Sequence, residues 1–286
     1  MTIRHRIHSI SVLPAPFNIM LEQALLGVKE DQRDELCVVA CVVSSAAWRF
    51  WHCWRAPEDN RQEHEWVVFA NVMRIAEAEG LTLRDKRVAT AFSFTHDSFF
   101  IPRIMEQSIR DATGEQKELL ERDKTRQRQE HMEGGARNAE FLLSSLKRPD
   151  ASDRPLFEVG EVEQCADIIR RHDSWKLNPA WVPPTSDRLA VVCLEGDALW
   201  PLHPLGVLAD LQRPKEGKTR DFNDPQEWHK QLTESLETLV ESRPRWRDIP
   251  SGDFIDGKSI FRTKEAHRLY SQWRQCWNLS EEQQAH

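Results

Sequence analysis

The chain has 286 residues, of which 40% are hydrophobic, and it carries a formal net charge of −7. This apolar content excludes a disordered chain, and no apolar run approaches the roughly 20 residues that span a bilayer. The acidic balance argues against binding a nucleic-acid polymer through its phosphates, because such binding needs a concentrated basic face. We therefore expect a soluble, cytoplasmic protein whose partner is a small molecule and not a membrane.

The first half of the chain predicts helices separated by polar breaks. Apolar residues at helical spacing fill residues 16–54, and the run CVVACVVSSAAWRFW predicts that the later part is a buried helix. After the polar stretch RAPEDNRQE, an amphipathic helix begins at His64 and ends at Gly80, a suitable residue for a helix C-terminus. A further apolar segment opens at Asp85 and stops at the pair His96-Asp97.

A strongly charged stretch, residues 115–130, comes next and leads into a segment that contains His131. After His131 the pattern turns amphipathic, which predicts a helix with one face in the core. The residues expected to point inward are Ala136, Ala139, Leu142 and Leu143.

The second half continues as helices and loops. After the loop RPDASDRP, Val159 to Arg171 predicts a helix that closes at His172, and RLAVVCLEGDALW predicts one that carries Asp197. Two final helices are expected at residues 227–242 and 263–277. No alternating pattern is long enough to predict a sheet, so the expected class is all-α.

The six cysteines are scattered along the chain and form no Cys-x-x-Cys pair. This spacing supplies neither a zinc-ligand pair nor a disulfide framework. Most of them stand among apolar neighbours, as in LCVVACVV and LAVVCLEG, so we interpret them as buried thiols without disulfide partners.

Six side chains suited to metal binding recur on these helices in the order His, His-Asp, His, His, Asp. They are His64, His96, Asp97, His131, His172 and Asp197. Imidazole nitrogen and carboxylate oxygen together suit borderline divalent ions, and a bridging carboxylate can hold two cations about 4 Å apart. Asp197 is the most informative, because a carboxylate in an apolar helix has to be paired, solvated or bound to a cation.

Each of these residues has a simpler interpretation. Any of them could be a paired or capping polar group in a helical core, and a histidine at a helix end often only binds a carbonyl group. A second His-Asp pair, His172-Asp173, could replace the first, although the order of the helices favours Asp97.

The same positions fall into a series of short motifs. These are R-x-x-H-x-x-x-V at residues 61–68, the His96-Asp97 pair, R-x-x-H with a following Gly-Ala at residues 128–136, I-x-x-H at residues 169–172, and the Asp197 helix. The series resembles the HD-domain superfamily of metal-dependent phosphohydrolases over about residues 58 to 212. The resemblance implies an HD-domain bundle of at least five helices in residues 58–212. The flanking residues 1–57 and 213–286 match no family, and we expect them to form helical extensions, the latter packed on the core.

The resemblance also implies a site and an activity. One metal ion would be held by His64, His96, Asp97 and Asp197, and a second by His131 and His172, with Asp97 as the bridging, catalytic residue. Iron or manganese is expected, with zinc, nickel or cobalt as alternatives. The implied reaction is hydrolysis of a small phosphorylated substrate, by preference a nucleotide, with a metal-bound hydroxide as nucleophile.

An anionic substrate also needs cations beyond the metals. The candidates that lie near ligand positions in the sequence are Arg103, Arg128, Lys176 and Arg188. Lys176, one helical turn after His172, is the first choice as a catalytic contact. Phe100 stands where the family members that act on cyclic dinucleotides have lysine, which disfavours those substrates.

Two other functions stay open at this point. The same ligand set is similar to that of mixed-valent di-iron oxygenases of the superfamily, which would use it to bind O₂. A non-catalytic HD-domain signalling or scaffold protein would instead use the terminal helices as a partner surface. The sequence leaves the oligomeric state open, with a homodimer as one alternative.

Overall fold

The computed structural model describes residues 17–52, 63–99, 111–150, 153–178, 181, 183–184, 186–212, 221, 223–241 and 261–276. Within these ranges the protein is all-α, as the sequence predicts, and the only β pairing there is an isolated antiparallel bridge between Lys147 and Pro155. No helix of the described part is long and apolar enough to cross a bilayer.

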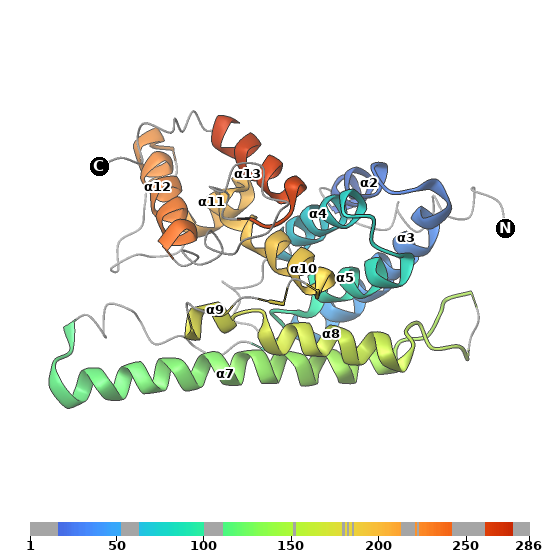
Figure 1. The fold of residues 1–286 in the computed structure, drawn as a ribbon, viewed down its shortest axis with the longest axis horizontal. Coiled ribbons are helices and arrows are strands. Elements are labelled where there is room, and N and C mark those ends of the chain that lie inside the picture. Colours follow the sequence, from blue (N-terminus) through green and yellow to red (C-terminus); the bar gives the residue numbers. More distant parts are fainter. Residues whose placement is uncertain are drawn as a thin grey trace.

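The helices form a bundle around one hydrophobic core. In chain order they are α2 (Phe17–Leu26), α3 (Glu30–His52), α4 (Glu63–Ala78), α5 (Leu83–Thr95), α7 (Gly114–Ser145), α8 (Val159–Arg171), α9 (Ser174–Leu177), α10 (Arg188–Ala198), η2 (Trp200–Leu202), α11 (Pro204–Gln212), α12 (Pro225–Glu241) and α13 (Lys264–Cys276). Helix α8 runs back along the C-terminal half of α7, and α10 lies between the α4–α5 pair and the C-terminal helices (Figure 1). In this arrangement α5 contacts α4, α7, α8 and α10, while α10 also packs on α4, and α8 on α7.

Local sequence signals set several of these boundaries. Gly80, just after α4, has a φ of 65°, a left-handed conformation that glycine adopts without strain. Thr82 caps α5 by accepting from the Asp85 N–H, and the Asp85 carboxylate accepts from the Thr82 N–H in return. Helix α8 has the predicted bounds, and His172 forms its C-cap.

The core joins helices from the whole described chain. Trp66 of α4 packs edge-on against Phe69 and Phe94, at ring-centroid distances of 5.9 and 4.8 Å. Leu21 of α2 and Leu36 of α3 are fully buried in the same core, so the N-terminal helices pack directly on α4 and α5. The four residues of α7 that were expected to point inward are all buried: Ala136, Ala139, Leu142 and Leu143.

The structure also differs from the sequence expectations. The charged stretch before His131 is continuous with the helix after it, so that α7 spans 32 residues, and its first buried residue is Met132. Ion pairs between residues four apart, such as Glu118–Arg122 at 3.8 Å, support a solvated helix there. The short helices α9 and α11 were not predicted, because each is too short for a periodic pattern to stand out.

The cysteine prediction is confirmed for three residues and wrong for one. Cys37, Cys165 and Cys193 are buried, and Cys41 is half-buried. Cys276 is exposed, because it lies at the end of α13 beyond the last buried turn. Cys53 lies outside the described residues.

Candidate metal centre

The structure brings all six predicted ligands together from five helices. His64 lies in the first turn of α4, His131 in the middle of α7, and Asp197 in the last turn of α10. His96 and His172 form the C-caps of α5 and α8, and Asp97 follows His96 directly. In the described part of the chain they form two groups able to hold a metal ion: the first group is His64, His96 and Asp197, and the second group is Asp97, His131 and His172.

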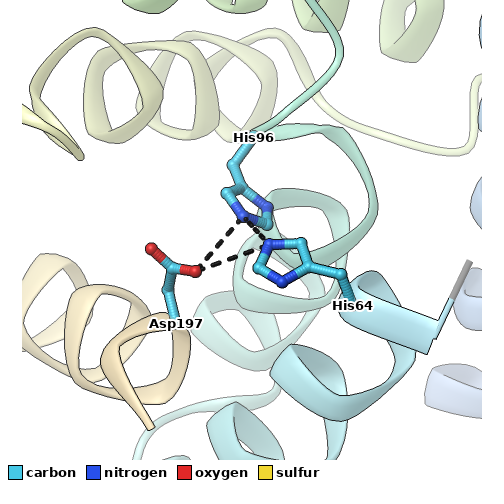
Figure 2. A group of neighbouring side chains, drawn as sticks. All are labelled: His64, His96 and Asp197. Carbon is cyan, nitrogen blue, oxygen red and sulfur yellow. Dashed lines mark hydrogen bonds and ion pairs between the residues drawn. The ribbon is translucent and has the colours of Figure 1, made fainter. Parts of the chain in front are cut away.

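The first group has its three ligand atoms at mutual contact distance. The Nε2 atoms of His64 and His96 lie 3.0 Å apart, and each lies 3.5 Å from Asp197 Oδ1. Figure 2 shows the two imidazoles and the carboxylate converging on one point from three different helices. Ligand atoms about 2.1 Å from one ion and at right angles to each other are about 3 Å apart, so the spacing fits a shared cation.

The second group shares the Asp97 carboxylate with the first. Asp97 Oδ1 lies 3.2 Å from His131 Nε2 and 3.7 Å from His172 Nε2. The other oxygen, Oδ2, lies 3.3 Å from His64 Nε2 and 3.9 Å from His96 Nε2. One carboxylate therefore faces a pair of imidazoles with each of its oxygens, which is the arrangement of a bridging ligand between two cations.

Backbone carbonyl groups fix the orientation of three of the four imidazoles. The Nδ1 atoms of His96, His131 and His172 lie 3.2, 2.5 and 2.7 Å from the carbonyl oxygens of Phe92, Phe99 and Ile169. A carbonyl oxygen can only accept, so each Nδ1 carries the hydrogen, and in a neutral ring Nε2 then presents a lone pair.

These lone pairs converge on each other. The Nε2 atoms of His131 and His172 are 3.3 Å apart, and both rings are fixed with the hydrogen on the opposite nitrogen. Two lone pairs at that distance repel unless a positive charge lies between them. The donor set thus fits a metal cation that both imidazoles coordinate.

The carboxylates of Asp97 and Asp197 also favour a positive charge at this site. Burial would raise the pKa of both carboxyl groups, but the neighbouring imidazoles hold the pKa of Asp97 well below its usual range and lower that of Asp197. Burial would likewise lower the pKa of His96, but the charge of Asp97 and the hydrogen bond with Asp197 outweigh it and raise this pKa to about 9. Both carboxylates are therefore ionised at neutral pH, and in the metal-free protein His96 carries a proton on Nε2 that a bound cation would displace.

The two carboxylates of the centre are the ligands most exposed to solvent. The side chains of His96 and His172 are 1% exposed, whereas that of Asp97 is 33% exposed and that of Asp197 is 23% exposed. These two buried imidazoles thus lie deepest in the centre, and solvent reaches the carboxylates. A site that binds a metal only to stabilise the fold is closed by protein ligands, whereas a site that reacts with a substrate keeps a position open.

The second His-Asp pair has a different role from the first. Asp173 is buried at the C-terminus of α8, where its Oδ1 lies 2.6 Å from Lys176 Nζ and its Oδ2 accepts from Arg128. Burial would raise its pKa, but Lys176, His172 and Arg128 together hold the pKa below its ordinary value. Asp173 therefore holds two cations beside the second group.

The other substrate candidates lie elsewhere. Arg188 at the start of α10 pairs with Glu79 at 3.2 Å, at the opposite end of that helix from Asp197. Arg103 lies outside the described residues. Lys176 and Arg128 are thus the two candidates that the structure places beside the ligands.

Trp200 is a neighbour of the centre that the sequence analysis did not single out. Its ring meets the His64 ring edge-on at a centroid distance of 5.0 Å, and it is largely buried. It lies three residues after Asp197 in the sequence, and this short separation is the feature that could have identified it as a neighbour of the centre. A tryptophan against His64 limits how far that ring can turn, since χ rotation would meet the indole.

The chain was also compared with known proteins. No protein-family model, no curated protein and no solved structure matches it. The assignment of a function therefore depends on the residues of the centre and on their geometry.

Proposed function

We propose that this protein is a dinuclear metal-dependent phosphohydrolase that acts on a small phosphorylated substrate, by preference a nucleotide. The observation that carries the proposal is the position of Asp97, whose two oxygens face two separate pairs of imidazoles. Four histidines and two aspartates supply nitrogen and oxygen ligands for two divalent ions, with iron or manganese expected. The resemblance to the HD-domain superfamily points to the same chemistry.

The ligands and the bound cations would have different roles in the reaction. Two cations held here would lower the pKa of a water between them and neutralise charge on a phosphoryl oxygen. Asp97 would link the two ligand groups through its two oxygens. The carbonyl groups bonded to His131 and His172 would fix the orientation of these rings, so that both Nε2 atoms point toward the same position. The exposed side of Asp97 and Asp197 leaves room for a substrate to approach.

Metal content is the first test of this proposal. Protein purified without added metal or chelator is expected to contain about two ions per chain by elemental analysis, and His131→Ala is expected to lose at least one of them. His229→Ala is the matched control, because His229 is an exposed histidine on α12 outside both groups. An unchanged metal content in His131→Ala would contradict the dinuclear assignment.

The identity of the metal and of the product distinguishes a phosphohydrolase from a di-iron oxygenase. Protein loaded with Mn²⁺ is expected to release phosphate from members of a nucleotide panel. Iron in the purified protein, together with O₂ consumption and no phosphate release from any of the panel, would overturn hydrolysis in favour of the di-iron oxygenase. Absence of bound metal even after reconstitution would exclude both and leave the scaffold reading.

Lys176→Ala is expected to raise KM for the phosphorylated substrate about 10- to 100-fold, with a smaller change in kcat. The physical reason is that a hydrogen bond from a charged group contributes about 1.5–3 kcal/mol, and Asp173 holds the lysine beside the second group. Steady-state kinetics on the Mn²⁺-loaded enzyme measure the effect. Lys230→Ala, an exposed lysine on α12, is the control. An unchanged KM in Lys176→Ala would assign Lys176 to pairing with Asp173 alone.

A further inference from the structure

Helices α4 and α10 approach each other closely at Gly196. A Cβ atom on this residue would overlap Val72 Cγ2, and it would also lie 3.0 Å from the Val72 backbone N and 3.2 Å from its Cα. The side chain of Val72 could turn away, but the backbone of α4 could not. Any residue larger than glycine would therefore push α10 away from α4.

A buried hydrogen bond ties the same two helices together. The Asn71 side chain donates to the Gly196 carbonyl oxygen at 3.2 Å, and Asn71 is itself buried. Gly196 precedes Asp197, and His64 lies two turns before Asn71 on α4. The contact thus fixes the distance between two ligands of the first group that lie on different helices.

The second group depends on a different contact. The turn after α5 lies against α7, where a Cβ on Gly135 would be 3.0 Å from the His96 carbonyl oxygen. Ser98 donates to the Gly135 carbonyl oxygen at 3.2 Å, and Asn138 donates to the Ser98 carbonyl oxygen at 3.1 Å. These bonds set the position of His131 relative to the turn that carries Asp97.

We propose that Gly196 and Asn71 are positioning residues that hold Asp197 against His64, and that they control the first metal position independently of the second. The inference depends on the dinuclear centre of the proposed function. It adds that each metal position has its own helix contact, so one position can be lost while the other and the fold remain.

Gly196→Ala is expected to reduce Mn²⁺ binding from two ions to one per chain. The apo-protein is titrated with Mn²⁺ by calorimetry, and electron paramagnetic resonance of the loaded protein reports whether two ions are spin-coupled. Wild type is expected to give a coupled pair, and the variant an uncoupled ion with unchanged circular dichroism. Gly160→Ala is the matched control, because this glycine is also helical but a Cβ there meets only Arg84 Nη2, at 3.5 Å.

The remaining ion identifies the lost position. Adding His131→Ala to Gly196→Ala is expected to abolish Mn²⁺ binding, whereas adding His64→Ala is expected to leave one ion. Adding Val72→Ala to Gly196→Ala removes the nearest overlapping atom and is expected to restore binding of the second ion in part. A merely structural role of Gly196 would not distinguish the two histidines.

Each outcome decides between the two proposals. Two coupled ions in both wild type and Gly196→Ala would overturn the positioning role and leave the dinuclear centre standing. A wild type that binds no Mn²⁺ would overturn both. If Gly196→Ala does not fold, Asn71→Ala is the alternative variant, because it adds no bulk. Binding of one ion weakened tenfold or more would support the inference, and two ions bound with unchanged affinity would contradict it.

Discussion

Asp97→Asn is expected to lower kcat/KM for the phosphorylated substrate by about 10³-fold or more and to remove at least one bound ion. Asp97 faces imidazoles of the two groups with different oxygens, since its Oδ2 lies 3.3 Å from His64 Nε2 and its Oδ1 lies 3.2 Å from His131 Nε2. An amide has the same shape but offers one neutral oxygen in place of two charged ones. The loss should exceed the roughly 10²- to 10³-fold effect of removing one hydrogen bond to a transition state, because both ions of the proposed centre would lose a charged ligand.

The same variant should leave the fold intact. The charge on Asp97 opposes ionisation of Asp197, but it also interacts favourably with the imidazoles around it, which hold its pKa well below the usual range, so the amide loses more than it gains in the metal-free protein. Circular dichroism of the apo-protein should therefore match wild type, and urea unfolding at neutral pH should show a lower free energy of unfolding. Asp153→Asn is the control, because that side chain is 95% exposed. Full metal content and activity in Asp97→Asn would contradict the bridging role.

Local patterns explain how far the sequence alone leads. Helix α8 has a strongly amphipathic pattern, and its bounds could be predicted to the residue. The burial of Ala136 and Leu143 followed from the same periodicity. In α7, by contrast, the pattern changes at His131 from solvated to amphipathic, and the continuity of the helix through that point depends on ion pairs that hydrophobic spacing does not report.

The composition of the candidate centre could be predicted, but not its geometry. The order of histidines and aspartates, together with the family resemblance, named all six members. Their division into two groups was also implied by the resemblance, but the distances between them could not be predicted, because His64 and Asp197 are brought together by the packing of α4 on α10. The pairing of Asp173 with Lys176 and Arg128 was also hidden, since a His-Asp dipeptide looks the same whether the carboxylate faces a metal or two cations.

Gly196 is another residue whose role could not be predicted from the sequence. Gly196 in a helix costs about 1 kcal/mol relative to alanine, so it is a local defect in an otherwise apolar helical sequence. The reason for it is visible only in the contact with Val72 of α4. A defect in local propensity that packing explains is typical of positions where two elements have to approach closely.

A buried ion-pair network away from the candidate metal centre joins four parts of the bundle. Arg87 of α5 bonds Glu161 of α8 through Nε at 2.8 Å and pairs with Glu35 of α3. Arg148, after α7, binds both oxygens of Glu35 at 2.9 and 2.8 Å. Glu161 is 3% exposed and Arg87 is 12% exposed, so the charges are largely removed from water. Breaking such a network leaves an uncompensated buried charge.

Arg87→Ala is therefore expected to lower the free energy of unfolding by about 3–5 kcal/mol, the largest stability effect expected here. Urea unfolding of the apo-protein, extrapolated linearly to water, measures it. Arg122→Ala is the control, because Arg122 pairs with Glu118 on the surface of α7, both side chains are more than 70% exposed, and such pairs contribute at most about 1 kcal/mol. Arg87→Met combined with Glu161→Leu should recover much of the loss, since it removes the buried charge along with its partner. A loss in Arg87→Ala no larger than that in Arg122→Ala would mean that water screens the network.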